Sequence, residues 1–239
     1  MANEVRAVTF DYWNTIVRAD ADQATHRVRA WREEYLGVGH DVDEATIRTA
    51  FRTVWDEHHA SWMRNEQYRA DRASELAIDL VGRPVDAATR TRLVERFLTA
   101  GEEAGFTLCD SVDVVLEDLR RRGVRLGIIC DVGFTPSTGL RRMLAGFGLL
   151  DHFDGWSFSD DVGWYKPARE IFEHALGYLG ATPETTVHVG DLRRTDVAGA
   201  RGMGMTSVRY RGVNDDDSPG PEGDHVLDDH AALMKALAL

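Results

Sequence analysis

The chain has 239 residues, which is enough for one large α/β domain or for a core domain with an insert. Its formal net charge of -12 argues against general binding to nucleic acid or to acidic membranes. The two cysteines, Cys109 and Cys130, provide no disulfide framework and fit a reducing compartment. Neither a signal peptide nor an apolar run of membrane-spanning length is visible, so we expect a cytoplasmic protein.

A short apolar run near the start of the chain ends on an acid. Residues 5–10 have the composition of a β-strand, Asp11 follows directly, and Thr15 comes four residues later. Ligands of an open α/β sheet bind beyond the carboxyl ends of its strands. Asp11 is therefore a candidate nucleophile or metal ligand.

A long helical block follows. Apolar and aromatic residues recur at helical spacing from Ile47 through Phe51 and Val54 to Trp62, and Asp86 has the position of a helix N-cap. This block interrupts a chain that otherwise alternates strands and helices. We therefore predict an inserted all-α domain over residues 18–104, and a core formed by residues 1–17 and 105–239.

The alternation resumes after the helical block. Residues 124–130, 155–158, 185–189 and 205–209 have strand character, and helical patterns separate them. Strands separated by helices of this length predict an α/β fold with a doubly wound, Rossmann-like parallel sheet.

Several strand ends in the core carry polar residues. Cys130 and Asp131 end one strand, and Asp191 and Asp196 follow another. Strand ends of such a sheet meet at one edge, where clustered carboxylates suit Mg²⁺. Lys166, one of only two lysines in the chain, would neutralise the same charges.

The motifs in combination are more specific than any one alone. They are a D-x-x-x-T loop from Asp11 to Thr15, the strand end at Cys130, Lys166 before Pro167, and the run G-D-L-R-R-T-D-V-A-G-A at 190–200. At these residues the sequence resembles the haloacid dehalogenase superfamily of hydrolases over nearly the whole chain. The resemblance implies that the inserted block is the family's α-helical, C1-type cap.

The resemblance also implies roles for individual residues. Asp11 would attack the substrate and become covalently modified before water releases the product, while Lys166 would stabilise charge. Mg²⁺ would bind Asp11, Asp191 and the backbone carbonyl of Trp13, with Asp196 as a further candidate ligand. Thr15 and Cys130 occupy motif positions beside these groups.

The sequence departs from the family's phosphatases at two positions. Trp13 stands where they carry a second aspartate that protonates the leaving group, and an indole cannot transfer that proton. Cys130 replaces a phosphate-binding Ser or Thr and is a weaker hydrogen-bond donor. Asp131 is a candidate alternative source of the proton.

These features favour one reaction and leave two alternatives. The favoured function is a Mg²⁺-dependent phosphatase that acts on a small, anionic, phosphorylated metabolite. A dehalogenase that cleaves a carbon–halogen bond and a non-catalytic ligand-binding protein are the alternatives. A phosphonatase is excluded within the resemblance, because no lysine precedes Lys166 to form a Schiff base. We expect no nucleic-acid or membrane partner, and either a monomer or a homodimer.

Overall fold

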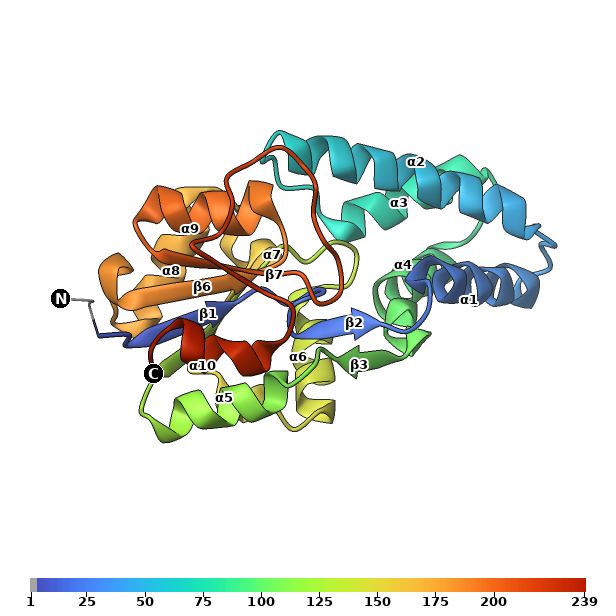
Figure 1. Ribbon diagram of the computed structural model, residues 1–239. Helices are drawn as coiled ribbons and strands as arrows, with labels where there is room; N and C mark the ends of the chain where they lie inside the picture. The colour runs from blue at the N-terminus through green and yellow to red at the C-terminus, as the bar shows by residue number, and fades with distance from the viewer. Residues whose placement is uncertain (1–3) are drawn as a thin grey trace. The chain divides into compact units, whose positions relative to one another are not determined.

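The computed structural model describes residues 4–239, which form two compact units (Figure 1). The first, here called the core unit, contains the chain up to Arg18, Phe106–Asp131 and Leu144–Leu239. The second, the helical unit, contains Ala19–Gly105 and Val132–Met143. The predicted division at 18 and 104 did not place Val132–Met143 with the helices.

A six-stranded parallel sheet forms the centre of the core unit, with the strand order β5-β4-β1-β6-β7-β8. The strands are β1 (Ala7–Phe10), β4 (Arg125–Cys130), β5 (Gly155–Phe158), β6 (Thr186–Gly190), β7 (Thr206–Tyr210) and β8 (His225–Leu227). This arrangement confirms the predicted α/β fold with a parallel, Rossmann-like sheet.

Helices and short turns connect the strands, as Figure 1 shows. The helices are α5 (Val112–Arg121), α6 (Ser137–Gly146), α7 (Ser159–Val162), α8 (Arg169–Leu179), α9 (Ala198–Met203) and α10 (Leu233–Ala236). The turns are η2 (Leu150–His152), η3 (Pro183–Thr185), the π-helical turn η4 (Arg193–Val197) and η5 (His230–Ala232). Apolar faces of α8 and α9 pack with Ile129 of β4 into one buried cluster.

The central position of β1 explains how the sequence places Asp11. Every residue of β1 is buried, and Val8 pairs with Leu126 on one side and with Val187 on the other. A strand that is buried on both faces needs a mostly apolar composition, and β1 has one apart from Thr9. The backbone amide of Asp11 continues the ladder by donating to Val189 at 2.8 Å. The Asp11 carboxylate therefore lies at the carboxyl end of a central strand of the sheet.

The helical unit is built around its own apolar cluster. Its elements are α1 (Gln23–Gly37), α2 (Glu44–Met63), α3 (Ala70–Val81), α4 (Ala87–Thr99), the turn η1 (Ala100–Ala104) and the part of α6 up to Met143. Asp86 caps α4 by accepting the amide of Thr89 at 2.7 Å, which confirms that sequence prediction. Phe134 explains why Val132–Met143 belongs to this unit, because its ring packs on Phe97 with centroids 5.0 Å apart.

Short strands were not predicted from the sequence. Strands β2 (Val17–Ala19) and β3 (Phe106–Leu108) pair as a two-stranded sheet, where the sequence pattern predicted only helix and connection. Strand β8 at the sheet edge was missed as well. A strand of three residues is too short to show a period-two pattern, so only its pairing in three dimensions reveals it.

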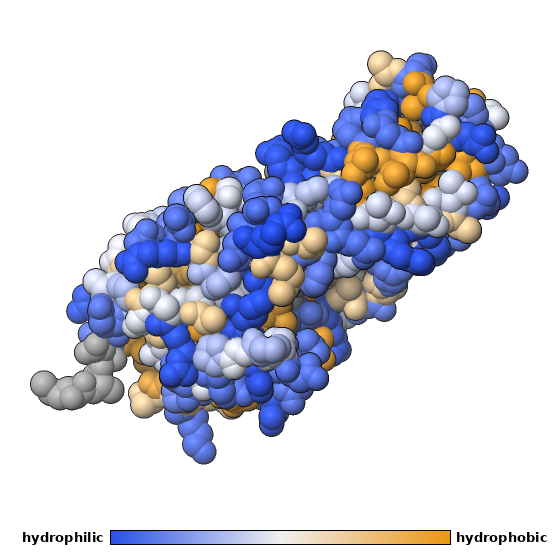
Figure 2. All heavy atoms as spheres, turned by 90° about the horizontal axis from the view of Figure 1, so that it is seen from above, coloured by the Kyte–Doolittle hydropathy of each residue, from blue (hydrophilic) through white to orange (hydrophobic). Residues whose placement is uncertain are grey.

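The surface of the helical unit carries exposed apolar side chains. Five of the eight large hydrophobic residues exposed within residues 4–239 belong to it: Leu36, Val38, Trp55, Met63 and Leu80. Figure 2 shows an apolar area on this unit, surrounded by polar residues. None of the helices in residues 4–239 combines the length and the apolar character that crossing a bilayer requires.

The cluster of the helical unit provides a test of the fold. Leu93 is fully buried in it, whereas Leu80 of α3 is 46% exposed. We expect Leu93→Ala to lower the free energy of unfolding by about 2–5 kcal/mol through lost burial and a residual cavity. Urea unfolding followed by circular dichroism measures this. The control Leu80→Ala should have a much smaller effect, and equal effects would contradict the described packing.

Candidate active site

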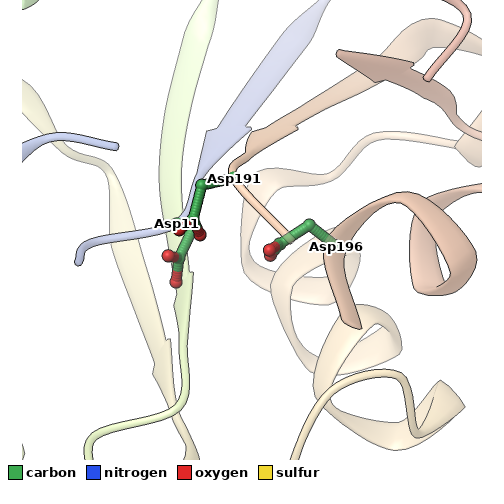
Figure 3. Close-up of side chains that lie close together, drawn as sticks. All are labelled: Asp11, Asp191 and Asp196. Carbon is green, nitrogen blue, oxygen red and sulfur yellow. The ribbon is translucent and has the colours of Figure 1, made fainter. Parts of the chain in front are cut away.

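Three carboxylates meet beyond the carboxyl ends of β1 and β6. Asp11 follows β1, Asp191 follows β6, and Asp196 lies on η4, as Figure 3 shows. One carboxylate oxygen of each lies within 4.8 Å of the others. All three residues are at most 6% exposed. The sequence prediction that these acids converge is therefore consistent with the geometry.

Lys166 lies against two of these acids. Its ammonium nitrogen is 2.6 Å from Oδ1 of Asp11 and 2.6 Å from Oδ1 of Asp196. It also donates to the carbonyl of Ile129 at 3.0 Å, so all three of its hydrogen-bond donors are used. This side chain is only 3% exposed, and the contacts fix the ammonium beside the Asp11 carboxylate.

Asp196 accepts four hydrogen bonds from the protein. Its Oδ1 accepts from Lys166 and, at 3.0 Å, from Nε2 of His188. Its Oδ2 accepts from the amide of Leu192 at 3.0 Å and from the Thr195 hydroxyl at 3.3 Å. Two donors on each oxygen are close to the accepting capacity of a carboxylate. Asp196 is thus mainly engaged in holding Lys166 and its own loop.

His188 is a member of this group that the sequence analysis missed. It lies in the middle of β6, fully enclosed, and its Nδ1 is 2.9 Å from the Thr9 hydroxyl while its Nε2 contacts Asp196. Burial lowers the pKa of His188. Because the Asp196 carboxylate can only accept, Nε2 is the donor in that contact. The available signal was a polar residue inside the run Val187-His188-Val189, because a buried imidazole must find hydrogen-bond partners.

Gly190 is required by the close approach of Asp196. A Cβ at this position would lie 2.2 Å from Cγ of Asp196, which is far inside van der Waals contact. The glycine in the Gly190-Asp191 pair therefore makes room for the Asp196 carboxylate, six residues beyond it in η4. The close contact with Asp196 is a physical reason for the glycine at position 190 of the motif.

The electrostatics of the group indicate a shortage of positive charge. Burial raises the pKa of Asp11 to about 7, with Lys166 opposing the rise and Asp196 adding to it. Burial, followed by the charges of Asp11 and Asp196, raises the pKa of Asp191 well above its usual range. Burial also opposes ionisation of Asp196, but Lys166 and His188 hold its pKa below the usual value. Three carboxylates share one ammonium here.

A divalent cation fits this arrangement. Asp191 forms no ion pair with any cation of residues 4–239, since Lys166 pairs with Asp11 and Asp196 only. The backbone carbonyl of Trp13 likewise accepts no hydrogen bond from that part of the chain. Carboxylate and carbonyl oxygens are the ligands that Mg²⁺ prefers. Asp11, Asp191 and the Trp13 carbonyl are the residues that could hold one.

The indole of Trp13 packs against other aromatic rings of the core unit. Its centroid is 4.9 Å from that of Tyr12, in an edge-to-face arrangement, and 6.0 Å from that of Phe106. The indole nitrogen is a hydrogen-bond donor only and does not ionise at neutral pH. The side chain at this position therefore offers an apolar surface instead of a titratable acid.

Cys130 and Asp131 have local roles. Cys130 is fully buried, and its thiol donates to the carbonyl of Asp131 at 3.4 Å. Burial, together with the nearby charge of Asp11, raises the pKa of the Cys130 thiol well above its usual value, so the thiol stays neutral. Oδ1 of Asp131 accepts the backbone amide of Lys166 at 3.0 Å. Asp131 thereby ties the end of β4 to the segment that carries the lysine.

Thr15 is buried, and its side chain makes no hydrogen bond to the carboxylates of Asp11, Asp191 and Asp196. Its hydroxyl has no hydrogen-bond partner in the described chain. Its carbonyl accepts from Nε2 of His230 at 2.8 Å, and the ring of His230 stacks on Tyr210 with centroids 4.1 Å apart. The structure therefore connects Thr15 to the sheet and to η5, and brings Lys166 with the three acids together as a separate group.

A buried aspartate, an ammonium and clustered acids beyond the strand ends of a parallel sheet form an arrangement that suits an α/β enzyme with an aspartate nucleophile. A family model described as haloacid dehalogenase-like hydrolase matches residues 5–204. The chain therefore belongs to the haloacid dehalogenase-like hydrolases, as the sequence motifs indicated.

Individual proteins extend this comparison. The chain is 34% identical over 131 residues to the human haloacid dehalogenase-like hydrolase domain-containing protein 3. The aligned residues cover 54% of this chain and 51% of that protein. The chain thus spans about half the length of this curated relative. It is 28% identical to the glyceraldehyde 3-phosphate phosphatase of Methanopyrus kandleri, with 90% of this chain and 91% of that protein covered. A phosphatase structure from Thermococcus onnurineus superimposes with a TM-score of 0.70 at 25% identity, covering 98% of each chain.

The two lysines of the chain offer a matched test of the central ion pairs. Lys166 is buried between two carboxylates, whereas Lys235 is exposed. We expect Lys166→Met to lower the free energy of unfolding by about 3–5 kcal/mol, because it leaves buried carboxylates without their counter-charge. Lys235→Met should leave it unchanged. Urea denaturation measures both, and an unaffected Lys166→Met would contradict the arrangement.

Proposed function

We propose that this hydrolase is a Mg²⁺-dependent phosphatase that acts on small phosphorylated metabolites, with Asp11 as its nucleophile. The observation that carries the proposal is the contact of the Lys166 ammonium with the Asp11 carboxylate, beside the unpaired acid Asp191. An ammonium and acidic metal ligands together suit an anionic substrate better than a neutral one. The similarity to a protein named glyceraldehyde 3-phosphate phosphatase supports the same class.

The chain's own residues would perform the reaction in two steps. A carboxylate oxygen of Asp11 attacks phosphorus, the bond from phosphorus to the leaving oxygen breaks, and an aspartyl phosphate forms. Water then attacks that phosphorus, which releases inorganic phosphate and restores the carboxylate. Throughout, Lys166 stays fixed by Asp196 and Ile129 and offsets negative charge at Asp11.

We propose that Asp11, Asp191 and the Trp13 carbonyl hold the Mg²⁺, which would supply electrostatic stabilisation of the transferring phosphoryl group. We assign Asp196 chiefly to holding Lys166, because its two oxygens already accept four hydrogen bonds. The helical unit would act as the cap that selects the substrate. That assignment agrees with its independent apolar core.

Trp13 limits the kind of leaving group. Without an acid at this position, the leaving oxygen departs as an anion and takes its proton from solvent. Leaving groups of low pKa, such as aryl or acyl phosphates, suffer least from this. We therefore expect turnover of such substrates to exceed that of alkyl phosphates.

Substitution of the nucleophile tests the proposal directly. Asp11→Asn removes the nucleophilic charge at nearly constant volume, and we expect phosphate release from an aryl phosphate with Mg²⁺ to fall by at least about 10³-fold. The exposed substitution Asp217→Asn serves as control and should retain activity. If the wild-type protein releases no phosphate from a broad panel of phosphomonoesters with Mg²⁺, the proposed function is wrong.

The residue at position 13 provides an independent test of the leaving-group argument. We expect Trp13→Asp to raise kcat/KM for alkyl phosphates by about 10²-fold, because it restores a carboxyl group that can protonate the leaving oxygen. Trp13→Asn also removes the indole but transfers no proton, so it should give no such gain. Steady-state phosphate release measures both. Equal gains in the two variants would contradict the acid–base explanation.

A carbon–halogen hydrolase is the second candidate, and Trp13 is the observation that favours it. A halide leaves without being protonated, so no acid is needed at that position. Halide release from 2-haloacids that persists in EDTA, with no phosphatase activity, would favour this candidate. Loss of any turnover in Asp11→Asn would rule out a purely ligand-binding role.

A further inference from the structure

A long loop between β7 and β8 lies against the segment that joins Asp191 to Asp196. Residues 211–224, here called the strap, join these two strands and contain three consecutive acids, at positions 215–217. Figure 1 shows it as the long orange-red loop between these strands. Within the core unit, its side chains make hydrogen bonds to η4 and to β7.

The strap contacts Arg193 in three ways. Oδ2 of Asp216 accepts the backbone amide of Arg193 at 2.7 Å, and Glu222 accepts from its guanidinium at 3.0 Å. Gly220 lies so close that a Cβ there would be 3.0 Å from Cβ of Arg193 and 3.2 Å from its carbonyl carbon. Arg193 is the first residue of η4, two positions after Asp191 and three before Asp196.

Asp216 is itself held in place. It is 8% exposed, its Oδ1 accepts the Ser218 amide at 3.0 Å, and its Oδ2 also accepts the Ser218 hydroxyl at 2.8 Å. Burial tends to raise the pKa of Asp216, but the amides of Arg193 and Ser218 lower it below the usual value. The carboxylate is therefore ionised and aimed at the start of η4, where helical amides lack partners within the helix.

The far end of the strap is anchored on the sheet. Arg209 of β7 is 2% exposed and binds both carboxylate oxygens of Glu222, at 2.7 and 3.1 Å. Asp224 accepts the amide and the hydroxyl of Ser207 at 2.9 and 2.8 Å. Because these contacts hold the strap on β7, the strap residues that contact Arg193 are also held in place.

We infer that the strap is a positioning device, in which Asp216 fixes the Asp191–Asp196 segment in the geometry needed for divalent-cation binding. Two neighbouring backbone amides at the start of this segment donate to different carboxylates. The amide of Leu192 donates to Asp196, inside the site, and the amide of Arg193 donates to Asp216, outside it. Without Asp216, the backbone amide of Arg193 would lose its acceptor, whereas Asp196 would keep its contacts with Lys166 and His188. The start of the segment would then be freer to move Asp191 away from Asp11. The inference rests on the proposed metal site.

The test compares Asp216→Asn with Asp217→Asn, the same change at the exposed neighbouring position. In the metal-free protein, we expect amide hydrogen exchange of residues 192–197 to be about tenfold faster in Asp216→Asn and unchanged in Asp217→Asn. Calorimetry should show a Kd for Mg²⁺ that is about tenfold higher in Asp216→Asn only, a typical effect for a residue that orients metal ligands. Identical exchange and affinity in the two variants would overturn the inference.

A second variant keeps the test valid if Asp216→Asn does not fold. Gly220→Ala changes no charge but presses on Arg193, so it should shift exchange of residues 192–197 and Mg²⁺ affinity in the same direction. A folded Gly220→Ala protein with wild-type values of both would overturn the inference. Faster exchange in these variants, with no Mg²⁺ binding by the wild-type protein, would contradict the proposed function while supporting the strap's hold on the segment.

Discussion

The pair of contacts from Lys166 to Asp11 and Asp196 is the interaction on which the rest of the site depends. Each distance is 2.6 Å, and all three side chains are almost completely buried. A buried ion pair is stable only when its remaining hydrogen-bonding groups are satisfied. The surrounding structure meets that condition through Ile129, His188 and the amide of Leu192.

The sheet and the loops contribute differently to this site. Strands β1 and β6 are adjacent, so the sheet alone places Asp11 beside Asp191. Asp196 reaches the same point only because η4 returns the chain and Gly190 leaves room for the carboxylate. Asp131 and the strap hold the flanking segments from outside. The rigid scaffold thus sets position, and polar side chains set orientation.

Much of this could be predicted from the sequence, for physical reasons. Buried parallel strands have continuous apolar runs, so β1, β4 and β6 and the acids after them were recognisable. Strands β2, β3 and β8 were not, because three residues carry no periodicity. The role of His188 and the contact of Asp216 with Arg193 depend on hydrogen bonds made after folding. The sequence shows His188 as a polar residue inside an apolar run, but it does not show which residues become hydrogen-bond partners of His188 or of Asp216.

A crystal structure with Mg²⁺ and beryllofluoride is the most direct test of the assigned nucleophile and metal ligands. This assignment predicts a beryllofluoride adduct on Asp11, and Mg²⁺ bound by Asp11, Asp191 and the Trp13 carbonyl. Asp196 should keep its contacts with Lys166 and His188. Mg²⁺ bound away from Asp191, or an Asp11 side chain that remains unmodified while the ion is bound, would contradict it.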